Sequence, residues 1–164
     1  MGDTMALIPA RAGSVGLPGK NRRVLVDRPL TMHSVACARL MPSVQSILLS
    51  TDDVLLAEIA GEQDVWIPEL RPSTLATDST PMADVIRYAV DLSDRVGQQP
   101  ISYLLLLDPT SPCRDPQAIE AALARLREDP TFDGVVSVSR PSFNPLWVGV
   151  TVTEAGQLNP HPML

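Results

Sequence analysis

The 164-residue sequence has few of the features that mark several large classes of protein. Its two cysteines, Cys37 and Cys113, are too few and too ordinarily spaced for a disulfide framework or a zinc site. It has no apolar run near the roughly 18 residues that a membrane-spanning helix needs. Residues 1–4 have neither the basic region nor the long apolar segment of a secretory signal. We therefore predict a cytoplasmic protein that does not bind membranes, with Cys37 in its core.

Lysine is also scarce, because Lys20 is the single lysine among thirteen basic residues. The net charge of −6 argues against nonspecific binding of nucleic acid. This charge is uneven: residues 1–23 hold four cations and one anion, whereas the rest of the chain holds nine cations and eighteen anions. A local basic region on an acidic protein suits a small polyanion better than a long one.

The basic region contains a loop with the sequence I-P-A-R-A-G-S-V-G-L-P-G-K-N, residues 8–21. The loop follows an apolar run, Met5–Ile8, that is typical of a buried strand. Glycine lets backbone N–H groups approach an anion, and Arg11 and Lys20 add the positive charge that a nucleoside triphosphate requires. The loop matches neither the Walker A pattern nor G-x-G-x-x-G. Its composition alone would also fit a plain glycine- and proline-rich connection with two solvated cations.

Apolar periodicity predicts strands that alternate with helices, an α/β doubly wound fold with a mostly parallel sheet and helices on both faces. The predicted strands are 5–8, 46–50, 65–67, 103–107 and 135–138. The almost wholly apolar strand 103–107 is expected at the centre of the sheet. The predicted helices comprise one over 31–40 and three that Asp52, Thr80 and Asp115 would cap.

Ligands of such folds bind beyond the carboxyl ends of the strands. Arg11, Asp52, Arg71 and Asp108 each follow a predicted strand, so we expect them at that edge. Near the end of the chain, Glu154–Gly156 reads as a hairpin turn between apolar segments.

The loop at 8–21 closely resembles the I-P-A-R-x-G-S-K-G-x-P-x-K-N motif of the acylneuraminate cytidylyltransferases, the CMP-sialic acid synthetases. Four more segments follow in that family's order: S-T-D-D at 50–53, L-R-P-S-T-L-A-T-D at 70–78, L-L-L-D-P-T-S-P-C-R at 105–114 and N-P-L-W at 144–147. The resemblance implies a nucleotide-diphospho-sugar transferase-like domain over residues 1–145. It also implies that residues 146–164 begin a β-hairpin arm through which the family forms homodimers.

The same resemblance implies transfer of CMP from CTP to a 2-keto-3-deoxy sugar acid such as sialic acid, with release of pyrophosphate and with Mg²⁺ as the metal. Arg11 and Lys20 would be the catalytic cations on the phosphates, and Asn21 would read the cytosine together with Arg71. The implied nucleotide-binding residues are Ala10, Arg11, Gly13, Ser14, Lys20, Asn21, Arg71, Ala76, Ser79 and Thr80. The acidic sugar would contact Asp108, Thr110 and Ser111, and the metal ligands are unassigned.

Several of these side chains also have a purely structural interpretation. Asp78 could serve only to pin the loop before its helix, and Asp52 fits a helix cap better than a catalyst. Thr110 and Ser111 could be turn residues.

The chain departs from the family pattern at two positions and in its extent. Val15 replaces a lysine of the motif, and Asp108 replaces a glutamine at a place where a carboxylate would repel an acidic sugar unless a cation intervenes. Family members continue further, through segments with sugar and metal contacts. One hypothesis is an active cytidylyltransferase with an altered choice of substrate, and the second is a shortened, non-catalytic relative that acts as a nucleotide-binding or interaction module. We expect the 164-residue chain to be catalytically poor. A third possibility is transfer of a different nucleotide, from UTP or GTP.

Overall fold

The computed structural model describes residues 3–13, 16–97, 100–138, 150–154 and 158–160. The chain divides into two compact units, Met1–Arg125 and Leu126–Leu164. The predicted division after residue 145 stays a prediction, because residues 139–149 lie outside the described part of the chain.

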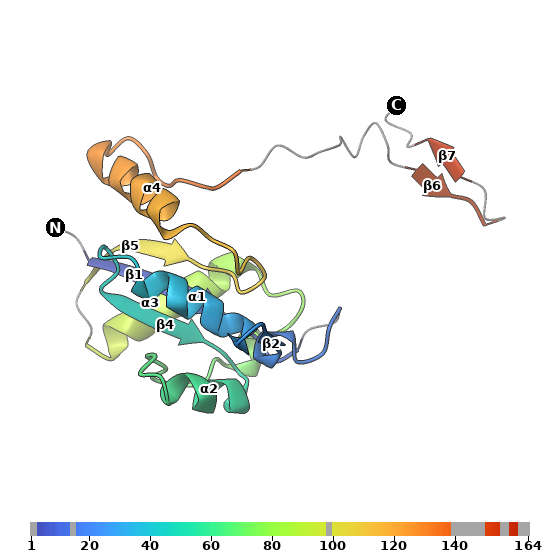
Figure 1. Ribbon diagram of the computed structural model, residues 1–164, viewed down its shortest axis with the longest axis horizontal. Coiled ribbons are helices and arrows are strands. Elements are labelled where there is room, and N and C mark those ends of the chain that lie inside the picture. Colours follow the sequence, from blue (N-terminus) through green and yellow to red (C-terminus); the bar gives the residue numbers. More distant parts are fainter. Residues whose placement is uncertain (1–2, 14–15, 98–99, 139–149, 155–157, 161–164) are drawn as a thin grey trace. The chain divides into compact units, whose positions relative to one another are not determined.

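The first unit contains a three-stranded parallel sheet with the strand order β4-β1-β5 (Figure 1). Its strands are β1 (Asp3–Pro9), β4 (Ser46–Ser50) and β5 (Ile101–Leu106). Leu7 at the middle of β1 lies opposite Leu48 of β4 and Leu106 of β5. Among the strands described, β1 is therefore central, and the expectation that 103–107 would take that place is wrong. The apolar pattern reports burial, and burial alone does not specify which strands are neighbours.

Helices cover both faces of this sheet, which confirms the predicted fold class. The helices are α1 (Leu30–Arg39), α2 (Val54–Gly61), α3 (Met82–Arg95) and α4 (Pro116–Glu128). Ala6 and Ile8 of β1 point to one face, where α1 and α2 pack, while Met5 and Leu7 point to the other face against Ala89 of α3. Figure 1 shows the same arrangement, with α1 in front of the sheet and α3 behind it.

Shorter elements complete the first unit. They are the 3₁₀ helices η1 (Lys20–Arg22) and η2 (Ser73–Leu75) and the small hairpin of β2 (Val24–Leu25) and β3 (Arg28–Pro29). Cys37 is buried in the core, as predicted. None of the helices in the described chain has the length and apolar character needed to cross a membrane.

Several predicted boundaries are wrong by a residue or more. The cap of α2 is Asp53 and not Asp52, since the Asp53 side chain accepts a hydrogen bond from the N–H of Leu56. Pro81 occupies the N-cap position of α3 in place of Thr80. The predicted strand at 65–67 is a single bridge between Leu48 and Trp66. Asp115 does cap α4, because its Oδ1 accepts from the N–H of Gln117 at 2.9 Å.

In the second unit, β6 (Val150–Val152) pairs antiparallel with β7 (Leu158–Pro160). These two strands flank the turn predicted at residues 154–156, of which 155 and 156 lie outside the described part of the chain. The hairpin arm and its role in dimerisation stay predictions. Residues 135–138 are irregular and exposed, so the strand predicted there is wrong. A strand needs a neighbour for its backbone hydrogen bonds, and no described strand pairs with this segment.

Candidate functional site

A cavity of about 150 Å³ lies at the carboxyl ends of β1 and β5. Its lining consists of Pro9, Arg11, Lys20, Asn21, Met82, Asp108, Pro109 and Thr110. Five of these residues are site residues predicted from the sequence, and they come from the ends of two strands and from η1. A larger hollow of about 430 Å³ lies between α2 and residues 65–70. Its charged lining residues are Glu58 and Glu69, so it does not suit a polyanion.

The backbone of Ala10 fixes the point at which the chain leaves the sheet toward the cavity. Its N–H donates to the carbonyl of Ser50 at 2.9 Å, and its carbonyl accepts from the hydroxyl of Thr51 at 2.6 Å. The Ala10 side chain is completely buried in the core. Both backbone groups of Ala10 are therefore used within the protein, and Arg11 begins at a rigid edge.

Asn21 closes the loop that begins at Arg11. Its amide Nδ2 donates to the Arg11 carbonyl at 2.9 Å, and its own carbonyl accepts from the Thr31 hydroxyl at 3.0 Å. The residue is buried, with 8% of its surface exposed. Asn21 thus has a structural function in this structure, and the predicted contact with cytosine stays a prediction.

The two carboxylates of the S-T-D-D segment hold the same loop to the end of β4. Asp52 Oδ1 accepts from the N–H of Ala12 at 2.8 Å. Asp53 is buried, and its Oδ2 accepts from Arg22 Nε at 2.7 Å while its other oxygen caps α2. Arg22 was not among the residues predicted from the sequence, although its place directly after Asn21 in the basic region was an available signal.

Arg71 is a buried cation with free donors. Its N–H donates to the carbonyl of Thr51 at 2.7 Å, which anchors the residue beside the end of β4. Only 5% of the residue is exposed, and its Nε and Nη2 have no hydrogen-bond partner among the described residues. Burial lowers the pKa of Arg71, the Asp52 carboxylate opposes that shift, and the charge of Arg11 adds to it. Arg71 is not part of the cavity lining, but it lies within electrostatic range of Arg11.

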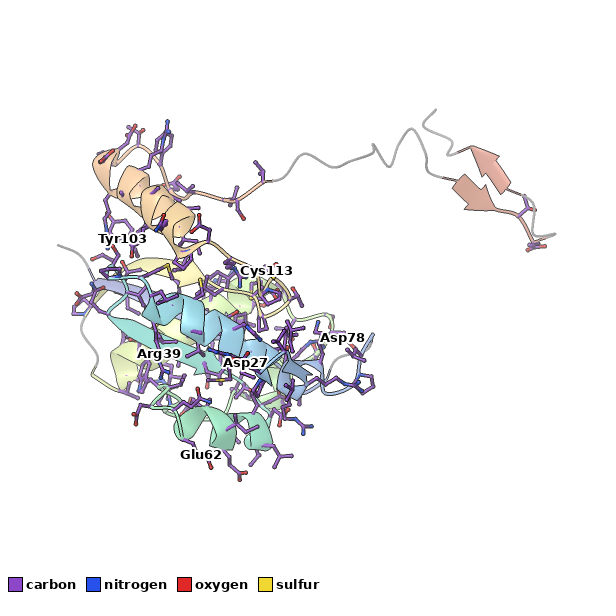
Figure 2. All side chains as sticks on the ribbon, in the orientation of Figure 1. Asp27, Arg39, Glu62, Asp78, Tyr103 and Cys113 are labelled. Carbon is purple, nitrogen blue, oxygen red and sulfur yellow. The ribbon has the colours of Figure 1, made fainter. Side chains whose placement is uncertain are left out.

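Arg11 itself forms an ion pair with Asp78, whose side chain is 62% exposed. Figure 2 shows Asp78 beyond the carboxyl ends of the strands. The flanking hydroxyl groups bond mainly to one another. Thr80 Oγ1 accepts from the N–H of Thr77 at 3.2 Å and lies 2.7 Å from Thr77 Oγ1, and Ser79 Oγ lies 3.3 Å from the same atom. Neither Ser79 nor Thr80 lines the cavity, nor does Ala76.

Asp108 and Thr110 form a tight turn after β5. Asp108 Oδ1 accepts from both the N–H and the hydroxyl of Thr110, at 2.8 and 2.7 Å, and the Asp108 carbonyl accepts from the N–H of Ser111 at 3.3 Å. Arg114, which the sequence analysis missed, donates to the Asp108 carbonyl at 2.6 Å and to the Ser34 hydroxyl at 3.2 Å. Burial lowers the pKa of Arg114. The guanidinium of Arg114 therefore holds the backbone of this turn in place.

Lys20 is the cavity's available cation, since its side-chain ammonium has no hydrogen bond or ion pair with any residue that the structure describes, while its backbone bonds with Leu17 and Arg23. Gly13 is exposed, and a Cβ added to it would meet nothing within 4 Å. Ser14 and Val15 lie outside the described residues. No three His, Cys, Asp or Glu side chains of the described chain lie together as a metal centre.

Residues 5–146 match the family model of the cytidylyltransferases. The chain belongs to the cytidylyltransferase family. It is 40% identical over 145 residues to the CMP-N,N'-diacetyllegionaminic acid synthase of Legionella pneumophila, covering 87% of this chain. It is 32% identical over 136 residues to the N-acylneuraminate cytidylyltransferase of Escherichia coli, covering 83% of this chain.

The fold is shared with a solved structure of CMP:2-keto-3-deoxy-manno-octonic acid synthetase complexed with CTP. The TM-score is 0.64 at 24% identity, over 79% of this chain and 49% of that one. This cytidylyltransferase chain spans 60% of the length of the Legionella relative and 31% of the Escherichia coli relative.

Proposed function

We propose that the chain binds CTP at the cavity and transfers CMP to an acidic 2-keto-3-deoxy sugar, with release of pyrophosphate. The observation that supports this most directly is the set of cationic donors that the described protein leaves without acceptors. Lys20 lines the cavity without a partner, and Arg71 is buried with Nε and Nη2 unbonded. Because buried polar groups are normally hydrogen-bonded, the unbonded donors of Arg71 point to an acceptor-rich ligand. Lys20, which is half-buried, adds positive charge to the cavity.

The choice of CTP over UTP or GTP follows from the relatives, whose names describe the synthesis of a CMP-linked sugar acid and a cytidylyl transfer. On this proposal the triphosphate lies on Arg11 and Lys20, and Arg71 with Asn21 faces the base. The relatives differ in their sugar acids, so the proposal extends to the class of acid and not to one member.

The proposed reaction is an attack by the anomeric hydroxyl of the sugar on the α-phosphorus, with the bond to pyrophosphate breaking. Negative charge grows on the phosphoryl oxygens and on the leaving group. Cations that are fixed before the reaction stabilise that charge most, since they need not reorganise. Arg11 begins at the rigid edge set by Ala10, and the backbone of Lys20 lies in η1, so the protein fixes the points from which both cationic side chains extend.

Asp108 fits one metal contact in the proposed site. Its Oδ1 serves the turn with Thr110, and its other oxygen has no hydrogen bond with the described residues. Mg²⁺ is normally held by one or two carboxylates together with substrate phosphates. We propose that Asp108 would help to hold the Mg²⁺ that accompanies a triphosphate. Its charge would then offset the repulsion between Asp108 and an acidic sugar.

The test is calorimetry of the chain with CTP, UTP and GTP, in the wild type and in Lys20→Ala. CTP should bind the wild type most tightly, and Lys20→Ala should lose about 1–3 kcal/mol of binding free energy, the range for one charge-assisted hydrogen bond. Arg87→Ala is the matched control, because it removes one charge from an exposed pair on α3. Unchanged CTP affinity in Lys20→Ala would place the triphosphate elsewhere.

A second measurement separates an enzyme from a binding module. Pyrophosphate release should be followed with CTP, Mg²⁺ and a panel of 2-keto sugar acids. Slow pyrophosphate release that requires a sugar acid supports transfer, whereas CTP binding without pyrophosphate release in the presence of any of these sugar acids supports the binding module.

The proposal also includes a homodimer in the cytoplasm.

A further inference from the structure

We propose that Asp78 is an internal substitute for a substrate phosphate. In the nucleotide-free protein, the Asp78 carboxylate forms an ion pair with the Arg11 guanidinium. This ion pair has to break when a triphosphate binds to Arg11. Asp78 therefore weakens nucleotide binding and keeps Arg11 from taking weaker anions. This inference rests on the proposed function, because it concerns the same site.

The ion pair joins two separate segments at the mouth of the site. Arg11 lies two residues past the end of β1, whereas Asp78 lies between η2 and α3. Arg11 is the cavity-lining partner, and its side chain is 32% exposed. Arg11, the residue predicted to bind phosphate, is thus already paired with the Asp78 carboxylate.

Asp78 is the member of the pair that can move. Its side chain is 62% exposed, and Arg11 is its one side-chain partner among the described residues. The segment around it is held independently by the bonds between Thr77 and Thr80. The carboxylate can therefore rotate into solvent while the segment stays in place.

The local charge balance favours that release when a polyanion arrives. Arg11 and Arg71 lie within electrostatic range of each other, Asp52 acts on Arg71, and Asp78 is paired with Arg11. Asp108 lines the same cavity as Arg11, and its carboxylate is held in the turn with Thr110. Asp52 is fixed by the N–H of Ala12, so Asp78 is the anion that can leave. A triphosphate bound beside an unreleased Asp78 would bring like charges together, which costs free energy.

The direction of the effect distinguishes this inference from its structural alternative. If Asp78 competes with phosphate, then Asp78→Asn frees Arg11 and tightens binding. If Asp78 instead holds Arg11 in the orientation that phosphate needs, the same variant weakens binding. Exposed ion pairs contribute little, so we expect an increase in affinity of about two- to fivefold.

The experiment is calorimetry of the full chain with CTP, inorganic tripolyphosphate and cytidine. Asp78→Asn should bind CTP and tripolyphosphate about two- to fivefold more tightly. Cytidine affinity should not change, because cytidine has no phosphate to compete with the carboxylate. The matched control is Asp84→Asn, which also removes one negative charge and one exposed pair with an arginine, and it should change none of the three affinities.

A second variant ties the effect to Arg11. In an Arg11→Ala background, Asp78→Asn should no longer raise the affinity for CTP or tripolyphosphate. Equal or weaker CTP binding by Asp78→Asn, or an equal gain for cytidine, would overturn the inference. If the wild type binds tripolyphosphate but not CTP, the proposed function fails while the tripolyphosphate comparison still decides the competition. If neither ligand binds the wild type or Asp78→Asn, both proposals fail.

Discussion

The buried side chain of Arg71 is expected to destabilise the folded chain, and the same side chain is proposed to bind the nucleotide. A buried guanidinium whose Nε and Nη2 lack acceptors loses hydration without recovering it in hydrogen bonds. Burial lowers the pKa of Arg71, which expresses the same cost. A ligand acceptor at these two atoms would offset that cost in the bound state. Stability and function are therefore expected to respond in opposite directions when this side chain is replaced.

We predict that Arg71→Met weakens CTP binding at least tenfold and leaves the free energy of unfolding unchanged or higher. Replacing a buried charge by an apolar side chain of similar size is often neutral or stabilising. Arg22→Met is the control, since it removes the partner of buried Asp53 and should destabilise the chain by about 1–2 kcal/mol. Denaturant titration and calorimetry measure the two effects. A larger loss of stability in Arg71→Met than in Arg22→Met would contradict the prediction.

The identities of the site residues were easier to predict than their contacts. Arg11 and Lys20 stand out as cations in a glycine-rich loop after a strand, and Asn21 was chosen because of the resemblance to the family's motif. Arg22 and Arg114 did not stand out, because each becomes a recognisable part of the site only through its partner. These partners are the Asp53 carboxylate and the Asp108 carbonyl, and they come close only in the folded chain. Partners that lie far apart in sequence leave no local pattern.

At the scale of single elements, the sequence predicts that a helix or strand is present better than it predicts the residues at which that element begins and ends. The S-T-D-D segment offers two adjacent carboxylates that could cap α2, and sequence alone does not choose between them. The choice is made by Thr51, whose hydroxyl donates to the Ala10 carbonyl and accepts from the N–H of Asp53 at 3.0 Å. That arrangement turns Asp53 toward α2 and leaves Asp52 for Ala12.

A side-chain cluster attaches the segment before Arg71 to α3. Glu69 Oε1 accepts from the Tyr88 hydroxyl at 2.7 Å and from Arg95 Nη2 at 2.8 Å. Burial together with the Glu69 carboxylate raises the pKa of Tyr88 to about 12. A tyrosine in the unfolded chain loses its proton near pH 10, whereas folded Tyr88 keeps its proton at that pH. Deprotonation therefore favours the unfolded state as the pH rises, and the free energy of unfolding falls. The contribution of Tyr88 is therefore present below about pH 10 and is lost as the pH rises to about 12.

We predict that Tyr88→Phe makes the alkaline loss of stability shallower, because the variant has no phenol to titrate at this position. Unfolding free energies measured by denaturant titration between neutrality and about pH 12 would show this. The protein has one other tyrosine, Tyr103, so Tyr103→Phe isolates the contribution of Tyr88. An identical alkaline slope in wild type and Tyr88→Phe would rule out a role for this cluster.

At the scale of the whole molecule, the doubly wound class could be predicted because alternating strand and helix patterns permit few other arrangements. The position of β5 could not be predicted, since an apolar strand does not encode its neighbours. The same limit explains the segment 135–138. Its β-branched residues favour a strand, but a strand forms only where a partner supplies hydrogen bonds.

This segment gives the described chain an exposed apolar run. Val136 is 81% exposed and Val138 is 89% exposed, and Val135 beside them is 45% exposed. Exposed β-branched runs without a strand partner are sites at which chains associate. A second copy of the chain is a partner that is always present at the same concentration.

We predict that the chain self-associates as its concentration rises, and that Val136→Lys combined with Val138→Lys reduces this association. The lysines place like charges on the apolar run, which opposes pairing between copies. Light scattering over a range of protein concentrations measures the effect. Val24→Lys is the control, because Val24 in the β2–β3 hairpin is also exposed, at 68%, and belongs to the other compact unit. A monomeric wild type at all concentrations, or association that only Val24→Lys reduces, would show that residues 135–138 are not the contact.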